Sequence, residues 1–145
     1  MIAFIDTHTL IGWIRESGEK DKVGVAAQKL MDNLERQKAD VVVSTGSVVA
    51  FLNALPESER QIQIALLEQC LIVHPFDAHA AQVANGLSKQ AGELDAYDGD
   101  KDRLKAHLRL VGTARASGSE VLYSPDGDLR KLAELAGLTA KNLAS

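Results

Sequence analysis

The amino-acid sequence predicts an α/β fold, a three-layer α/β/α sandwich around a central parallel sheet of four to five strands. Short apolar runs of strand length alternate with longer segments in which apolar residues recur at helical spacing. This order implies right-handed βαβ units, which place helices on both faces of a parallel sheet. The chain has no internal repeat, low-complexity tract or dividing linker, so residues 1–145 are predicted to form a single domain.

Cap and breaker residues delimit the elements in the first half of the chain. The apolar run at residues 2–5 precedes Asp6, which can cap a helix that Gly18 closes. The continuous β-branched run at residues 41–43 suits a strand buried on both faces. Pro56 separates two helices. The predicted elements are a strand at 2–5, a helix before Gly18, a helix at 23–37, a strand at 41–44, helices at 48–55 and 57–69, and a strand at 71–74.

The second half of the chain repeats this alternation. Gly118 and Gly137 follow helical patterns and mark their carboxyl ends. An acidic stretch with two glycines nearby is predicted to form a loop. The predicted elements are a helix at 78–91, the acidic loop at 93–102, a helix at 103–117, a strand at 120–123 and a helix at 129–136.

Composition excludes several classes of protein. Only 4% of the residues are aromatic and the net charge is -4, which argues against nucleic-acid binding by base stacking or by a global basic surface. No stretch reaches the roughly 18 apolar residues of a membrane span, and the N-terminus lacks the pattern of a secretory signal. The single cysteine, Cys70, lies beside an apolar run and is predicted to be a core thiol in a reducing compartment. A cytoplasmic protein with no membrane partner is predicted.

Carboxylates follow two of the predicted strands directly. Asp6 comes after the first strand, and Asp126 and Asp128 come after the strand at 120–123. Sites in parallel α/β sheets lie outside the carboxyl ends of the strands. If these two strands are neighbours, the carboxylates converge and need a counter-ion or a shared proton. Divalent cations with oxygen ligands are the usual solution, so the sequence predicts a cation site here.

Four blocks of the sequence, taken together and in order, resemble the PIN domain of VapC-type toxin ribonucleases and related RNA-processing nucleases. The resemblance covers nearly the whole chain. The blocks are AFIDTHTL at residues 3–10, VSTGSVVAFL at 43–52, KAHLRLVGTA at 105–114 and VLYSPDGDLRKL at 121–132. The resemblance implies a PIN-like fold, a homodimer, RNA as substrate and a cognate antitoxin as partner.

The resemblance also implies a set of site residues. Asp6 and Asp126 match acids that hold Mg²⁺ or Mn²⁺ and serve catalysis in the family, and Asp128 is a near neighbour in both roles. The family glutamate of the second block falls on Ala50, and the family aspartate of the third block falls on His107. The implied function is a divalent-metal-dependent ribonuclease attenuated by these two replacements. The alternative is a non-catalytic PIN-like module that binds RNA or a protein partner. The residues that would bind substrate are not identified.

Structural roles compete with these functional ones. Asp6 can be a helix cap, Asp126 and Asp128 can be turn residues, and His107 can be a hydrogen-bonded interior residue. Asp98, Asp100 and Asp102 have calcium-loop spacing, but arginines stand at positions six and twelve, which excludes an EF-hand.

The third block also lies beside charged residues with open roles. Asp102 precedes His107 by about one turn and can supply a substitute carboxylate, or it can lie in a solvated loop. A group of basic residues on the same helix can attract RNA phosphates or can form an ordinary solvent-facing stripe. These basic residues are Arg103, Lys105, Arg109 and Arg115.

Overall fold

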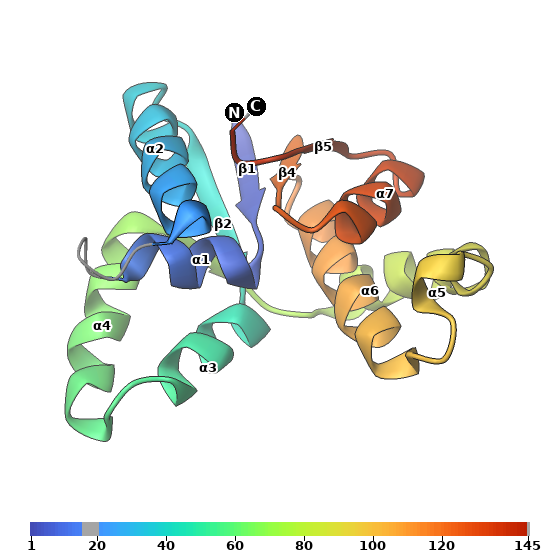
Figure 1. Ribbon diagram of the computed structural model, residues 1–145, viewed down its shortest axis with the longest axis horizontal. Helices are drawn as coiled ribbons and strands as arrows, with labels where there is room; N and C mark the ends of the chain where they lie inside the picture. Colours follow the sequence, from blue (N-terminus) through green and yellow to red (C-terminus); the bar gives the residue numbers. More distant parts are fainter. Residues whose placement is uncertain (16–20, 145) are drawn as a thin grey trace.

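A computed structural model describes residues 1–15 and 21–144 of the chain and confirms the predicted α/β class. Five parallel strands form one sheet in the order β3-β2-β1-β4-β5 (Figure 1). The strands are β1 (Ile2–Ile5), β2 (Asp40–Ser44), β3 (Ile72–His74), β4 (Val121–Tyr123) and β5 (Thr139–Lys141). The helices in the described residues are α1 (Thr7–Ile14), α2 (Lys22–Arg36), α3 (Thr45–Asn53), α4 (Glu57–Cys70), α5 (Ala78–Gly92), the 3-10 helix η2 (Asp95–Tyr97), α6 (Lys101–Ala116) and α7 (Gly127–Leu135).

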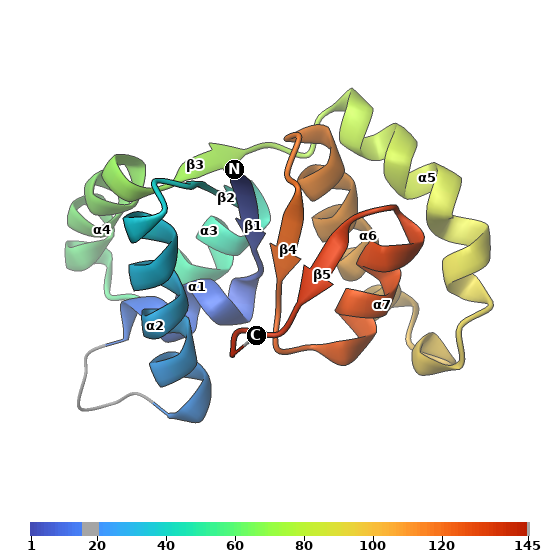
Figure 2. The same ribbon diagram turned by 90° about the horizontal axis from the view of Figure 1, so that it is seen from above.

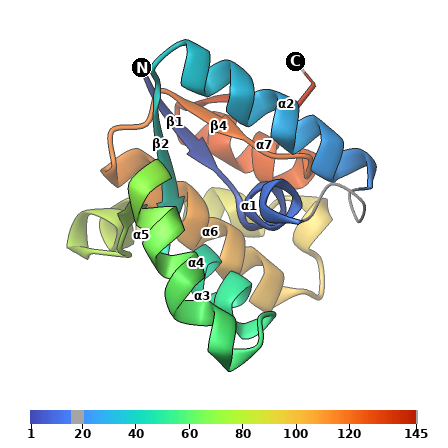
Figure 3. The same cartoon turned by 90° about the vertical axis from the view of Figure 1, so that its left-hand side faces the viewer.

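Helices cover both faces of the sheet, as a three-layer sandwich requires. Successive side chains of a strand point to opposite faces, and in β1 Ala3 and Ile5 pack against one buried cluster while Phe4 packs against the other. The first cluster joins the sheet to α1, α2, α3 and α4, and the second joins it to α5, α6 and α7. Figure 2 shows these two groups of helices on either side of the strands, and Figure 3 looks onto the α1–α4 side. The central strands are therefore buried on both faces.

The structure differs from the sequence prediction at three places. Cys70 is exposed and is not a core thiol, because α4 continues through it and carries it to the rim beside the edge strand β3. The fifth strand, β5, lies at the other edge and carries a lysine in place of an apolar run. The first helix ends at Ile14, and Gly18, which was predicted to close it, lies outside the described residues.

None of the helices in residues 1–15 and 21–144 is long and apolar enough to cross a lipid bilayer.

Helices α5 and α6 approach each other closely at Gly112. A Cβ atom placed on Gly112 would lie 2.5 Å from the carbonyl oxygen of Ala80 and 3.4 Å from Cβ of Ala84. Because the obstacle is backbone, a side chain here would push the two helices apart. We expect Gly112→Ala to lower the free energy of unfolding by about 2 kcal/mol, although helix propensity alone favours alanine.

The matched control is Gly86→Ala in α5, where nothing lies within 4 Å of the added Cβ. This change should raise the free energy of unfolding by about 0.5–1 kcal/mol. Urea unfolding followed by circular dichroism measures both variants. Stabilisation by both substitutions would contradict the close approach of α5 and α6 at Gly112.

Candidate functional site

The pairing of β1 with β4 brings the two acidic segments together. Ile5 lies opposite Tyr123 in this parallel pair, so the residues that follow, Asp6 and Ser124, meet at the carboxyl edge of the sheet. The Ser124 hydroxyl donates to Oδ2 of Asp6 at 2.6 Å and accepts from the amide of Asp126 at 3.0 Å. The prediction that these strands are neighbours is confirmed, and Ser124 is the link between the acids.

Asp6 is a buried helix cap. Its side chain is 1% exposed, and Oδ1 accepts from the amide of Thr9 at 3.0 Å and from the Thr9 hydroxyl at 2.5 Å. With the Ser124 hydroxyl on Oδ2, the carboxylate accepts three hydrogen bonds from protein groups. The capping role considered from the sequence is therefore present, and both carboxylate oxygens already have donors.

Asp126 caps helix α7 and faces the Arg103 guanidinium and the His107 imidazole. Its Oδ1 accepts from the amides of Asp128 and Leu129 at 2.9 and 3.2 Å. Its Oδ2 lies 3.2 Å from the Arg103 guanidinium and 3.5 Å from Nε2 of His107. Burial raises the pKa of Asp126, but the two amides, His107 and Arg103 together lower this pKa below its ordinary value. The carboxylate is therefore ionised.

Arg103, on the first turn of α6, lies at the centre of the acidic group. Its guanidinium donates to Oδ2 of Asp128 at 2.8 Å as well as to Asp126. The hydrogen bond to Asp128 raises the pKa of Arg103 above its ordinary value. Arg103 is therefore neither part of a solvent-facing stripe nor a cation free to bind RNA phosphates, which are the two roles considered for it from the sequence. Sequence reasoning missed its role, because the pairing depends on how α6 packs beside α7.

His107 is a buried, hydrogen-bonded residue, which is the structural role that the sequence allowed for it. Its Nδ1 lies 2.6 Å from the hydroxyl of Tyr97, and the two rings meet edge to face. Burial is the main cause that lowers the pKa of His107, so the neutral imidazole is favoured. Burial likewise raises the pKa of Tyr97 to about 12. Tyr97, on η2, is a second site neighbour that the sequence analysis did not single out.

The second-block side of the site carries hydroxyl groups in place of an acid. Ala50 is exposed on α3, three residues after Ser47 and hence on the same side of the helix. The Ser47 hydroxyl contacts that of Thr7 at 2.6 Å and that of Ser44 at 2.9 Å. Ser44 caps α3 by accepting from the amide of Ser47. Nothing in this group replaces the carboxylate that Ala50 lacks.

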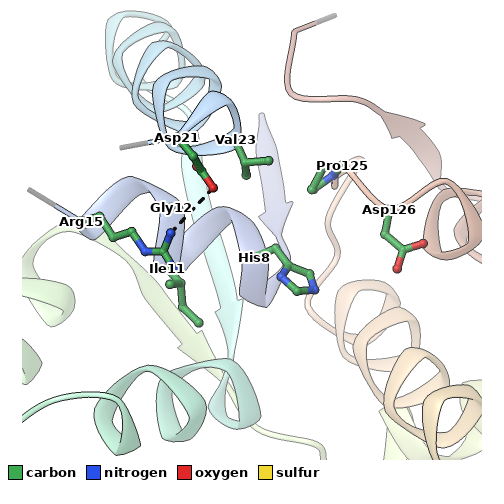
Figure 4. A pocket seen from close by; sticks show the side chains of 8 residues that line it. All are labelled: His8, Ile11, Gly12, Arg15, Asp21, Val23, Pro125 and Asp126. Atoms are coloured by element: carbon green, nitrogen blue, oxygen red, sulfur yellow. Dashed lines mark ion pairs between the residues drawn. The ribbon is translucent and has the colours of Figure 1, made fainter. Parts of the chain in front are cut away.

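An open cavity of about 420 Å³ lies beside Asp126. Figure 4 shows Pro125 and Asp126 on one side of it, Arg15 and Asp21 on the other, and His8 between them. Arg15 and Asp21 form an ion pair at 3.8 Å. The acidic segment after β4 is therefore reachable from solvent.

The side chains around Asp6, Asp126 and Asp128 are not arranged to hold a divalent cation. Among the described residues, no three or more His, Cys, Asp or Glu side chains are placed to hold a metal ion together. Asp6 is buried and accepts three hydrogen bonds from protein groups, and Asp126 and Asp128 share the Arg103 guanidinium. This arrangement does not fit Mg²⁺ or Mn²⁺. The metal-binding and catalytic assignments of Asp6, Asp126 and Asp128 stay predictions that require Arg103 to move away.

The other candidates lie outside this group or supply no charge to it. Asp102 is exposed in the first turn of α6 and has no contact with Asp126 among the hydrogen bonds and ion pairs of the described residues. Lys105, Arg109 and Arg115 are exposed on α6, and the guanidinium of Arg109 lies over the ring of Phe76.

Comparison with known proteins identifies the fold. No family model and no curated protein matches the sequence. Among solved structures, VapBC2 from Rickettsia felis, bound to a DNA fragment from its promoter, is similar over 98% of this chain and 98% of that chain, with a TM-score of 0.66 and 15% identity. VapBC-1 from nontypeable Haemophilus influenzae is similar over 100% of both chains, with a TM-score of 0.63 and 18% identity.

A third similar structure is Mycobacterium tuberculosis VapC20, a sarcin-ricin loop cleaving toxin. It covers 94% of this chain and 96% of its own, with a TM-score of 0.58 and 15% identity. The likeness extends over nearly the whole length in all three cases, while the sequence identity is low. The chain therefore has the PIN-like fold that the VapC structures share and that its sequence predicts.

Proposed function

We propose that this chain is a PIN-like protein of the toxin–antitoxin type, a divalent-metal-dependent ribonuclease whose activity is attenuated. The observation that carries the proposal is the convergence of Asp6 and Asp126, through Ser124, at the carboxyl edge of a VapC-like sheet. Attenuation is proposed because Ala50 has no ligand atom and His107 is a buried imidazole. A site with fewer carboxylates binds Mg²⁺ or Mn²⁺ more weakly and activates water less.

The proposed partners are RNA as substrate, a cognate antitoxin and a second copy of the chain in a homodimer. Two of the similar structures are of VapBC, and the antitoxin is proposed by analogy with them. A cytoplasmic location is proposed together with these partners.

A non-catalytic PIN-like module that binds RNA or a protein partner is the second candidate. The observation that favours it is the pairing of Arg103 with both Asp126 and Asp128. A PIN-like site whose carboxylates pair with the chain's own arginine can keep the fold of a nuclease without binding the metal ion that cleavage needs.

The test of the proposed function is cleavage of a mixed RNA panel with Mg²⁺ and with Mn²⁺. We expect slow cleavage that needs the divalent cation and that falls at least about tenfold in Asp126→Asn, which keeps the side-chain shape but removes a charged ligand. Asp98→Asn, at an exposed carboxylate, is the control for the same change in charge. Equal activity in Asp126→Asn and the unmodified chain would refute the assignment. Binding of RNA without any cleavage, measured by fluorescence anisotropy, would favour the second candidate.

A further inference from the structure

The guanidinium of Arg103 is held from several directions at once. One amino group donates to Asp126 at 3.2 Å and to Asp128 at 2.8 Å, and the other donates to the carbonyl of Ala96 at 3.3 Å. The guanidinium carbon also lies 5.4 Å from the centre of the Tyr97 ring. These contacts come from η2 and α7, on both sides of the α6 terminus. The cation is therefore positioned by the fold and does not merely lie on the surface near two acids.

The backbone of α6 places Arg103 at this point. Asp100 caps the helix and its carboxylate accepts from the amide of Arg103 at 3.0 Å, which fixes Arg103 as the third residue of the helix. The side chain of a residue in the first turn points back toward the helix N-terminus, and here η2 and the start of α7 lie in that direction. Asp100 thus fixes where α6 begins, and with it the point from which the Arg103 side chain extends.

Arg103 and a divalent metal ion would have to use the same carboxylate oxygens, and the charges of the group do not favour both cations at once. Asp126 and Asp128 supply two negative charges, and Arg103 supplies one positive charge within hydrogen-bond distance of both. A divalent cation on these carboxylates would lie close to the guanidinium, and like charges at such a separation repel strongly in a partly buried site. Only one of the two cations can use the Asp126 and Asp128 oxygens.

We propose that Arg103 is the resident cation of the acidic site and competes with divalent metal ions for Asp126 and Asp128. The proposal rests on the proposed site but not on its catalytic activity. The chain itself then neutralises part of the charge of the site, and the two carboxylates become ligands only when the guanidinium leaves. The chain's own arginine, rather than the missing acids alone, limits metal binding.

Binding of Mn²⁺ alone, measured by isothermal titration calorimetry and by the electron paramagnetic resonance signal of the free ion, tests this proposal. We expect Arg103→Gln to bind one Mn²⁺ with an affinity at least about tenfold higher than the unmodified chain, because a repelling charge is removed. The gain should disappear in Arg103→Gln/Asp126→Asn. Arg103→Lys should stay close to the unmodified chain, since it keeps the positive charge.

Arg109→Gln is the matched control, because it removes the same charge from the same helix at a guanidinium that lies over Phe76. It should leave Mn²⁺ affinity unchanged. A folded Arg103→Gln with no gain in affinity over Arg109→Gln would overturn the proposal. So would tight, stoichiometric Mn²⁺ binding by the unmodified chain that Asp126→Asn abolishes, since competition from Arg103 leaves only weak binding there, and this measurement does not depend on the folding of Arg103→Gln. Because cleavage of RNA is not the readout, failure of the proposed ribonuclease activity is distinguishable from failure of this inference.

Discussion

The triple variant Ala50→Glu/His107→Asp/Arg103→Gln is expected to cleave RNA with Mn²⁺ at least about 100-fold faster than the unmodified chain. The first two changes supply the acids that the PIN resemblance places at these positions. Position 50 lies on the same side of α3 as Ser47, and position 107 lies beside Asp126. The third change removes the guanidinium that pairs with Asp126. Initial rates on a mixed RNA panel measure the effect.

Two controls separate the change at Arg103 from the added acids and tie the activity to Asp126. Ala50→Glu/His107→Asp without the change at Arg103 should gain little, because the guanidinium still pairs with the acids. Adding Asp126→Asn to the triple variant should return cleavage to background. Thermal unfolding with and without Mn²⁺ checks that a new carboxylate at the buried position 107 does not simply unfold the chain. A folded triple variant that is no faster than the unmodified chain would show that the PIN-like site is not the nuclease site.

Replacing Asp6 with alanine is expected to lower the free energy of unfolding by about 3 kcal/mol. The carboxylate accepts from the Thr9 amide, the Thr9 hydroxyl and the Ser124 hydroxyl, and both partner residues are fully buried. Alanine leaves these donors without an acceptor in a place that water does not reach, and it removes the cap of α1. Urea unfolding at neutral pH, followed by circular dichroism, measures the loss.

Asp6→Asn is the informative companion. Its amide oxygen can still accept from Thr9, and its amide nitrogen can donate to the Ser124 oxygen, so we expect a loss of only about 1 kcal/mol. A loss as large as that of Asp6→Ala would mean that the negative charge itself, rather than the hydrogen bonds, stabilises this corner. Equal stability of Asp6→Ala and the unmodified chain would contradict the buried network altogether. Activity should accordingly be tested at Asp126, where a substitution disturbs the core less.

The parts of the site that depend on strand order were predictable from the sequence. An acid that directly follows a strand must lie at the carboxyl edge of the sheet, so Asp6 and Asp126 were placed correctly once β1 and β4 proved to be neighbours. The sequence left the role of His107 open between a ligand and an interior residue, and the structure shows a buried ring bonded to Tyr97. The prediction that Cys70 is a core thiol is wrong, because the apolar run beside it forms the edge strand β3 rather than a strand in the middle of the sheet.

The role of Arg103 lay beyond the sequence because it depends on how three elements pack together, one of which, α7, is separated from α6 by β4. In the sequence it is one of several basic residues on a helix, with nothing to distinguish it from Arg109. Its partners lie on α7, and its supports lie on η2. The only local indication in the sequence is the capping acid Asp100, three residues earlier. It fixes where α6 begins, but it does not identify the residues that the Arg103 side chain contacts.

The hydrogen bond between Ser124 and Asp6 joins residues that are 118 positions apart. During synthesis β1 leaves the ribosome well before its neighbour β4 and the acids that follow it. Contacts between such distant residues form late and are slow to establish. An incomplete translation product therefore carries Asp6 without its partners, and premature termination before β4 yields a chain that has no acidic site to use.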